Sequence, residues 1–154
     1  MRSIHIRKAA KADVPEIVRL LAEEPHAADR ECYTVPLPDS YYQAFDAIHH
    51  DHNQLLLVAE NEDHIFGTLQ LTFIPNISFQ GSWRALIEAV MVDNAFQGQG
   101  IGSRMIEWAV AEAKQRGCRF IQLTSNKKRN EAHRFYGRLG FTASHEGFKR
   151  DLGA

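Results

Sequence analysis

The stretch NAFQGQGIGSRM, residues 94–105, contains three glycines within five positions, Gly98, Gly100 and Gly102. Glycine lets the backbone approach a ligand closely and adopt positive φ angles, so these residues are candidates for presenting backbone N–H groups to an anion. The stretch follows an apolar segment at 86–92 and precedes apolar residues at helical spacing over 103–116. It therefore predicts a strand-to-helix turn, where free N–H groups and the positive end of the helix dipole favour a phosphate group.

The spacing of the glycines narrows the kind of phosphate ligand. A dinucleotide-binding turn has the pattern G-x-G-x-x-G and an acidic residue about 20 positions later for the ribose. Here the pattern is G-x-G-x-G, the segment FIQLTSN at 120–126 has no acidic residue, and no Gly-Lys-Ser/Thr sequence is present. These features disfavour dinucleotides and nucleoside triphosphates, and they leave a glycine-rich turn without a ligand as the structural alternative.

Two motifs together resemble those of the GNAT N-acyltransferase superfamily. Gln97-x-x-Gly100-x-Gly102 after an apolar strand is similar to its acyl-CoA pyrophosphate loop, and AHRFYGRLGF at 132–141 is similar to its A-x-x-F-Y-x-x-x-G-F segment. A weaker resemblance extends along the whole chain to small bacterial members, some described as transcriptional regulators, and the closing segment is similar to aminoalkylphosphonate N-acetyltransferases. The resemblance implies acetyl-CoA as co-substrate and, as acceptor, a primary amine of a small molecule or peptide that attacks directly in a ternary complex.

The resemblance also implies which residues contact acetyl-CoA. The pantetheine arm would lie along the predicted strand, where a backbone N–H polarises the thioester carbonyl, at Val90, Met91 and Val92. The pyrophosphate would lie on Gln97, Gly98, Gln99, Gly100, Ile101, Gly102 and Ser103. The second motif would add Arg129, Asn130 and His133. Arg129 departs from the family pattern, which usually has asparagine there, and the basic run 127–129 either contacts the 3′-phosphate of CoA or is simply solvated.

Two side chains are candidates for acid–base chemistry. The Tyr136 hydroxyl, with an ordinary pKa of about 10, is protonated at neutral pH and can donate to a thiolate, although aromatic residues on amphipathic helices are more often core. Glu88 lies inside an apolar run, where an unpaired buried charge would be costly, so it is either exposed or retained for function. The resemblance implies a role as general base, because several members of that superfamily have a glutamate here that accepts the amine proton, often through water. A structural hydrogen bond and direct amine recognition are the alternatives. His133 is a second candidate base.

The acceptor site is the least specified part of the sequence. Its candidate wall residues are Tyr33, Tyr41, Tyr42, Trp83 and Arg84. An arginine beside aromatic residues suits an acceptor with a carboxylate or phosphonate group, but packing is an equally good explanation of each aromatic residue. The histidines of HHDH at 49–52 lack a matched set of partners such as H-E-x-x-H, so we interpret them as a surface tract and expect no metal.

Periodicity and turn residues predict the elements that position these residues. Strands are expected at 3–9, 54–61, 65–75, 82–93 and 120–126, followed by two short strands at the end of the chain. Helices are expected at 14–24, 41–51 and 103–116, and at the segment with Phe135 and Tyr136. The expected fold is α+β (mixed α/β), a GNAT fold with a central, mostly antiparallel sheet of six to seven strands and about four flanking helices.

Composition agrees with one globular enzyme domain over residues 1–154. Of the 154 residues 44% are apolar and 24% charged, and the net charge of −1 gives no basic footprint for nucleic acid. Two cysteines form no disulfide framework, and no apolar run resembles a membrane span or signal peptide, so we expect a cytoplasmic protein. The resemblance allows a homodimer. The alternative function is a non-catalytic, acyl-CoA-binding regulatory module.

Overall fold

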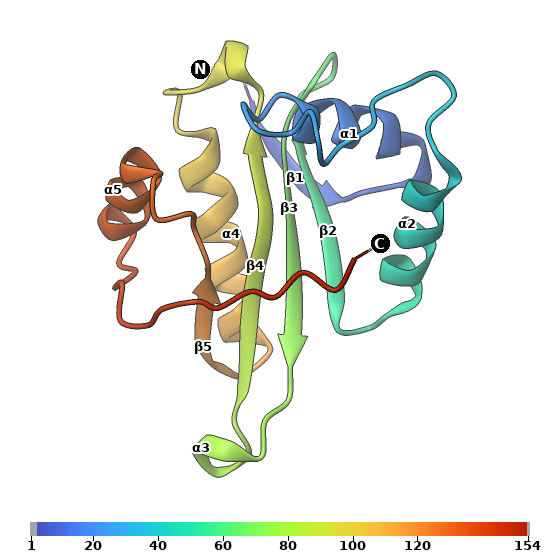
Figure 1. The fold of residues 1–154 in the computed structure, drawn as a ribbon. Coiled ribbons are helices and arrows are strands. Elements are labelled where there is room, and N and C mark those ends of the chain that lie inside the picture. The colour runs from blue at the N-terminus through green and yellow to red at the C-terminus, as the bar shows by residue number, and fades with distance from the viewer. Residues whose placement is uncertain (1–2, 154) are drawn as a thin grey trace.

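A five-stranded sheet forms the centre of the computed structural model, which describes residues 3–153 (Figure 1). The strands are hydrogen-bonded in chain order, and all neighbours are antiparallel except the last pair, which is parallel. The strands are β1 (His5–Lys8), β2 (Gln54–Glu60), β3 (Ile65–Ile74), β4 (Trp83–Val92) and β5 (Cys118–Leu123). The helices are α1 (Val14–Ala22), α2 (Asp39–His50), α3 (Ser78–Gly81), α4 (Ile101–Gln115) and α5 (Asn130–Arg138), with 3-10 turns η1 (Lys11–Asp13) and η2 (Asn94–Phe96).

Two hydrophobic clusters lie on opposite faces of the sheet. In β2, Leu55 and Leu57 are buried in the cluster that includes Met105 of α4. Leu56 and Val58 belong instead to the cluster that contains the apolar residues of α1 and α2. Because successive side chains of a strand point to opposite faces, α4 covers one face and α1 with α2 covers the other. Figure 1 shows α1 and α2 together at one side of the sheet, and α5 at the opposite side.

A bulge interrupts β4 near its middle. Two β3 residues that are two positions apart pair with Glu88 and Met91, so Ala89 and Val90 together lie opposite the single residue Leu69. Ala89 has a φ angle of 52°, which is uncommon for a residue with a Cβ and marks local backbone strain. A bulge bends a strand and redirects the side chains that follow it.

The bulge coincides with the point where β5 leaves β4. Ile87 before the bulge and Val90 and Val92 after it all pack on the α4 side, whereas strict alternation would place Val90 and Val92 on the opposite face from Ile87. β5 pairs with β4 only from Trp83 to Ile87. Within residues 3–153, the backbone of 88–92 therefore has a strand partner only on the β3 side, and a gap opens beside this half of β4.

The prediction of six to seven strands is wrong in number, although the α+β class is confirmed. The two expected terminal strands do not form, and residues 139–153 lie outside every helix and strand. In this segment Phe148 is 93% exposed and Leu152 is 88% exposed, so neither apolar side chain gains the burial that stabilises a strand. Two helices, α2 and α4, also begin two residues earlier than predicted.

Candidate active site

The glycine loop gives α4 an open N-terminus. Gly98 and Gly100 have φ angles of 77° and 81°, and a Cβ atom added to either would meet nothing within 4 Å. The first intrahelical bond at this end is donated by Arg104 N–H to the carbonyl oxygen of Gly100, at 3.1 Å. The N–H groups of Ile101, Gly102 and Ser103 are the first in the helix, so they have no carbonyl acceptor within it and point out of its positive end. This arrangement suits a phosphate group.

Gly102 serves a different purpose from the other two glycines. An added Cβ would lie 3.3 Å from the Phe135 ring and 3.6 Å from a Val92 methyl group. The absence of a side chain therefore lets α5, the end of β4 and the first turn of α4 pack closely together. Of the three, only Gly98 and Gly100 have positive φ angles, and Gly102 is small because of packing.

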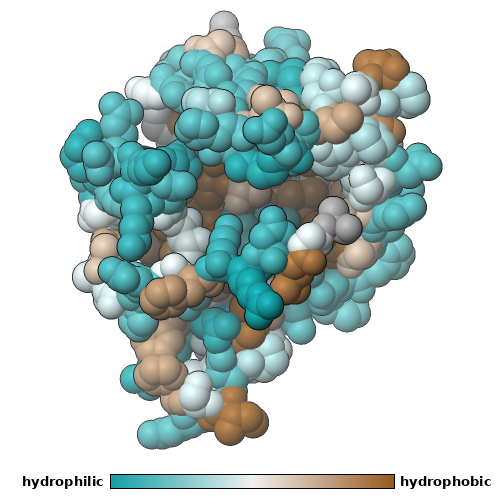
Figure 2. Space-filling model, viewed as in Figure 1, coloured by the Kyte–Doolittle hydropathy of each residue, from teal (hydrophilic) through white to brown (hydrophobic). Residues whose placement is uncertain are grey.

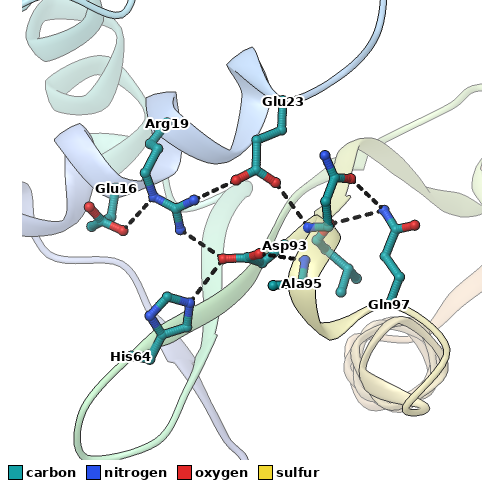
Figure 3. Close-up of polar contacts among 9 residues, drawn as sticks. Glu16, Arg19, Glu23, His64, Asp93, Ala95 and Gln97 are labelled. Atoms are coloured by element: carbon teal, nitrogen blue, oxygen red, sulfur yellow. Dashed lines mark hydrogen bonds and ion pairs between the residues drawn. The ribbon is translucent and has the colours of Figure 1, made fainter.

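A buried carboxylate fixes the turn that leads into the glycine loop (Figure 3). Asp93, only 6% exposed, accepts from the Ala95 N–H at 2.9 Å and contacts Arg19 Nη2 at 3.1 Å and His64 Nε2 at 2.9 Å. Burial works to raise the pKa of Asp93, but these hydrogen bonds outweigh it and hold the pKa below its ordinary value. The carboxylate therefore joins α1, the β2–β3 turn and η2.

Glu23 extends the same network. Its carboxylate contacts Arg19 Nη1 at 2.5 Å and accepts from the Asn94 N–H at 3.0 Å, so α1 also holds the start of η2 (Figure 3). Gln97, predicted to bind the cofactor, donates through Nε2 to the carbonyl oxygen of Val92 at 3.3 Å and to Asn94 Oδ1 at 3.0 Å. The Gln97 side chain therefore supports the turn. Gln99 is exposed and lies within the loop, between Gly98 and Gly100.

The gap beside β4 exposes backbone hydrogen-bonding groups. Asp93 N–H donates to the carbonyl oxygen of Phe66 on β3 at 2.8 Å. Because N–H directions alternate along a strand, the N–H of Val92, and by the same alternation that of Val90, points away from β3 toward the gap. Met91 has the opposite orientation and pairs with β3. The predicted pantetheine-binding stretch therefore offers two outward N–H groups.

Tyr136 lies on α5 with its ring against aromatic neighbours. Its ring centroid is 5.1 Å from that of Phe135 and 6.0 Å from that of Phe141. Burial raises the pKa of the Tyr136 hydroxyl, and the charge of Arg129 offsets part of that effect. The hydroxyl therefore stays protonated at neutral pH. Phe135 anchors α5 against Gly102, which places Tyr136 at the same end of the sheet as the glycine loop.

The remaining residues of the second motif lie at the start of α5. Arg129 is the N-cap residue and Asn130 is the first residue of the helix. His133 Nε2 lies 2.9 Å from the carbonyl oxygen of Asn126, which can only accept, so this nitrogen carries a proton and the side chain holds the β5–α5 connection. The contact gives His133 a structural role in addition to its predicted place near the cofactor.

The predicted acceptor residues form two separate groups. The Tyr41 hydroxyl accepts from the Cys32 N–H at 2.8 Å and so holds the α1–α2 connection, in which Tyr33 is exposed. Tyr42, a residue of α2, packs against the hydrophobic cluster beneath α1 and α2. Trp83 and Arg84 lie at the other end, where β4 begins. The Arg84 guanidinium donates through Nη1 to Asn76 Oδ1, and its Nε is buried without a partner among the described residues.

Glu88 is exposed at the gap, on the sheet face that α1 and α2 cover. It lies four positions after Arg84, or about 13 Å along the strand at the usual rise. Sequence reasoning missed the residues beside it on that face, Gln70 of β3 and Gln54 of β2, as well as the Asp93 network. The alternation of polar residues at 68, 70 and 72 within an otherwise apolar strand was the available signal.

Other features of the described chain were not predicted from the sequence or show no second site. A cavity of about 390 Å³ is lined by Glu16 and residues 60–65, none of which was predicted to bind a ligand. Residues 3–153 contain no cluster of three or more His, Cys, Asp or Glu side chains arranged to hold a metal ion. Their helices are all too short or too polar to cross a membrane.

Comparisons with known proteins agree with the geometry. The family model described as "Acetyltransferase (GNAT) family" matches residues 22–141. The crystal structure of a transcriptional regulator from Bacillus halodurans C-125 is 49% identical, with a TM-score of 0.95 over 97% of this chain and 100% of that one. A predicted acetyltransferase from Clostridium acetobutylicum, solved with acetyl-CoA, shares the fold at 21% identity and a TM-score of 0.74, over 97% of each chain.

A curated relative matches a shorter region. The aminoalkylphosphonate N-acetyltransferase of Salmonella typhimurium is 41% identical over 71 residues, which make up 46% of this chain and 46% of that protein. The match therefore spans a little under half of the relative's length. The family model, by contrast, covers most of the chain, including the glycine loop, the bulged strand and the Phe-Tyr helix. The chain belongs to the acetyltransferase (GNAT) family.

Proposed function

We propose that the protein is an acetyl-CoA-dependent N-acetyltransferase that acts on a primary amine by direct attack in a ternary complex. One observation carries this proposal: the bulge at Ala89 opens the β4 edge, with outward N–H groups at Val90 and Val92, between exposed Glu88 and the open N-terminus of α4. Hydrogen-bond donors at the thioester carbonyl favour acyl transfer, and the N–H groups of a helix N-terminus suit a pyrophosphate. Along β4 and into α4, the donors for the thioester come first and those for the pyrophosphate follow, which is the order that an extended acetyl-CoA requires.

The residues have separable roles in this proposal. The N–H groups of Ile101, Gly102 and Ser103 bind the pyrophosphate, while the β4 edge pairs with the extended pantetheine arm as an added strand would. An outward N–H of β4 stabilises the oxyanion that forms as the amine attacks. Glu88 accepts the amine proton, directly or through water, and Tyr136 donates its proton to the departing thiolate sulfur.

The acceptor that we propose is a small amine with an anionic group. The Salmonella relative is named for aminoalkylphosphonates, which carry an amine and a phosphonate. The sheet face that presents Glu88 also carries Arg84, whose unpartnered Nε and planar guanidinium suit such an anion once the side chain turns from Asn76. Peptide amines remain in the test as a second acceptor class.

An amine-panel assay with acetyl-CoA tests the proposal by following thiol release. The panel contains 2-aminoethylphosphonate, an alkylamine of the same length without the acid, an amino acid and a short peptide. We expect turnover of at least one amine and preference for the acid-bearing member. Tight CoA binding without turnover of any amine would refute the enzyme proposal and favour the regulatory module instead.

We also propose that the protein forms a homodimer through β5. This strand pairs only with β4, so its other edge presents unpaired backbone groups within the described chain. Exposed aromatic residues gather beside it: Phe120 is 4.9 Å from Phe79, ring centroid to ring centroid, and Arg119 lies over both rings. Unpaired edges with adjacent aromatic surface are typical sites of chain association.

A further inference from the structure

A row of polar side chains crosses the sheet on the face covered by α1 and α2, next to Glu88. Gln70 of β3 lies directly opposite Glu88, and Gln54 of β2 lies diagonally beyond it. The next β2 residue on this face, Leu56, packs under the helices. Gln54 and Gln70 are half-buried and Glu88 is exposed, so the row lies where the helices no longer cover the sheet.

A hydrogen-bond relay fixes the orientation of both amides. The Asn53 N–H and the Gln54 amide lower the pKa of Asp51, which is therefore ionised and can only accept. Gln54 Nε2 donates to Asp51 Oδ2 at 3.2 Å, so Gln54 Oε1 faces β3. There it accepts from Gln70 Nε2 at 2.9 Å and from Thr72 Oγ1 at 3.5 Å. The relay leaves Gln70 with its Oε1 as the free end.

Gln70 Oε1 and the Glu88 carboxylate form a pair of acceptors on adjacent strands. No group in residues 3–153 donates a hydrogen bond to Gln70 Oε1. Directly opposite residues of an antiparallel pair have Cβ atoms about 4.5–5.5 Å apart, so the two side chains can contact one ligand group. Two oxygen acceptors, one of them charged, match a group with several N–H donors and a positive charge, which is a primary ammonium.

The surroundings leave this pair accessible to a small molecule. An added Cβ on Gly147 would lie 3.6 Å from a methyl group of Thr124, the residue directly after β5, so the C-terminal segment passes where β5 leaves β4. Figure 1 shows this segment running across the sheet, and Figure 2 shows the same face hollowed above it. The hollow lies over the upper parts of β3 and β4 in this view.

We propose that Gln70 is an acceptor-binding residue: its Oε1 and the Glu88 carboxylate together hold the primary ammonium group of the acceptor before a proton is lost to Glu88. The inference rests on the proposed function and adds a specificity. A primary ammonium has three N–H donors, and each N-methyl group removes one and adds bulk between the two oxygens. Primary amines are therefore preferred over their N-methyl derivatives.

The test uses Gln70→Leu with the fastest amine of the panel and its N-methyl derivative. Loss of a hydrogen bond to a charged group is expected to raise KM for the primary amine about ten- to hundredfold, with KM for acetyl-CoA unchanged. The preference for the primary over the N-methyl amine is expected to disappear. Gln70→Glu, which keeps an oxygen acceptor, is expected to retain that preference and to shift the pH profile of kcat/KM upward, because a second carboxylate stands beside Glu88.

Two further variants make the result decisive. Gln70→Met keeps the length of the side chain and replaces Gln70→Leu if the latter misfolds. Gln115→Leu, the same substitution at an exposed position at the far end of α4, is the matched control and should leave all constants unchanged. Turnover with an unaltered amine KM and unaltered amine preference in Gln70→Leu or Gln70→Met overturns the inference alone. A wild-type chain silent on the whole panel overturns the proposed function and the inference with it.

Discussion

The two residues proposed for acid–base chemistry, Tyr136 and Glu88, differ in how their side chains are packed. Tyr136 has a half-buried hydroxyl whose pKa is raised by burial, while its ring packs between Phe135 and Phe141. The ring and the hydroxyl therefore have separate roles, and a substitution can remove one and keep the other. Glu88, in contrast, is exposed and makes no core contacts, so its replacement tests chemistry with little change in stability.

The first prediction concerns the Tyr136 hydroxyl. Tyr136→Phe keeps the ring packing and is expected to lower kcat about 10²-fold, the usual scale for a positioned acid. KM for acetyl-CoA should change far less, because the lost interaction develops only as charge appears on sulfur. Steady-state kinetics with an identified amine measures both, and a thermal melt close to wild type is the control. Full turnover in Tyr136→Phe, with chemistry shown to limit the rate, would assign the proton to another donor.

The raised pKa of Tyr136 determines how its contribution to stability changes with pH. A group whose pKa is raised in the folded state contributes stability below its unfolded value of about 10, and that contribution is lost as pH rises through the folded value. The hydroxyl is thus a competent donor throughout the neutral range. A loss of rate caused by deprotonation of Tyr136 is therefore expected only above pH 10.

The second prediction concerns Glu88 as the base. Glu88→Gln is expected to lower kcat/KM about 10²-fold for amines that are protonated at the assay pH, because these must lose a proton before attack. Raising the pH deprotonates the amine in solution, so the deficit should shrink toward the pKa of the amine. Parallel pH profiles of wild type and Glu88→Gln would show that Glu88 binds the acceptor or supports structure without accepting the proton.

At the scale of elements, the glycine loop, the bulged strand and the Phe-Tyr helix meet at Gly102. The loop orients the N-terminus of α4, the strand supplies the outward N–H groups, and the helix carries Tyr136. Each element contributes backbone geometry as much as side chains. At Gly98 and Gly100 the surrounding protein leaves room for a side chain, so glycine is favoured there by the positive φ angle and not by packing.

The third prediction uses the two ends of α4 as a matched pair. Gly100 at its start and Gly117 after its end both have positive φ, 81° and 76°, and open space around an added Cβ. Gly100→Val and Gly117→Val therefore carry similar backbone strain, about 1–2 kcal/mol. Only Gly100→Val projects a side chain toward the predicted phosphate, so it alone should weaken acetyl-CoA binding, by more than tenfold. Calorimetry that finds equal affinities in both folded variants would remove the loop from the site.

The sequence predicted the positions of most helices and strands but not the bulge in β4. The β2, β3, β4 and α4 segments carry clear apolar periodicity, and the structure confirms them to within two residues. The bulge at Ala89 gave no signal, because alanine has no preference for positive φ, and only the pairing with β3 reveals it. The two terminal strands were predicted from periodicity, but this segment has few apolar residues, and those at 148 and 152 are exposed to solvent.

The site shows the same division. The glycines and Tyr136 were predicted from local motifs. By contrast, Gln70 contacts Gln54, 16 residues away in sequence, and Asp93 contacts Arg19, 74 residues away. Such contacts depend on strand register and on helix docking, which periodicity within one segment does not specify. The sequence also grouped Arg84 with the tyrosines of the α1–α2 region, whereas the structure places Arg84 near the start of β4.

At the scale of the whole molecule, the Asp93 network joins the N-terminal helix to the loop in the second half of the chain. The fourth prediction is that Asp93→Asn lowers the free energy of unfolding by about 1–3 kcal/mol at pH 7, because Arg19 and His64 lose a buried charged partner. A lowered pKa means that this contribution is present above the unfolded value of about 3.9 and is lost as pH falls through the folded value. Urea unfolding should therefore separate the two proteins at pH 7, and the difference should shrink as the pH falls below about 4. A constant difference across this range would place the effect in packing rather than charge.

The last prediction concerns association through the β5 edge. If two copies join there, light scattering should give twice the 17.5 kDa of one chain, and Phe120→Glu should give the monomer mass, because two copies of the new charge would meet across the symmetric interface. Phe120 is already exposed, so the substitution should leave the melting temperature of the single chain nearly unchanged. Phe148→Glu is the matched control, since Phe148 is also exposed but belongs to the C-terminal segment and to no strand. A dimer that survives Phe120→Glu but dissociates in Phe148→Glu would place the interface in the C-terminal segment, and a wild-type monomer at micromolar concentration would end the dimer proposal.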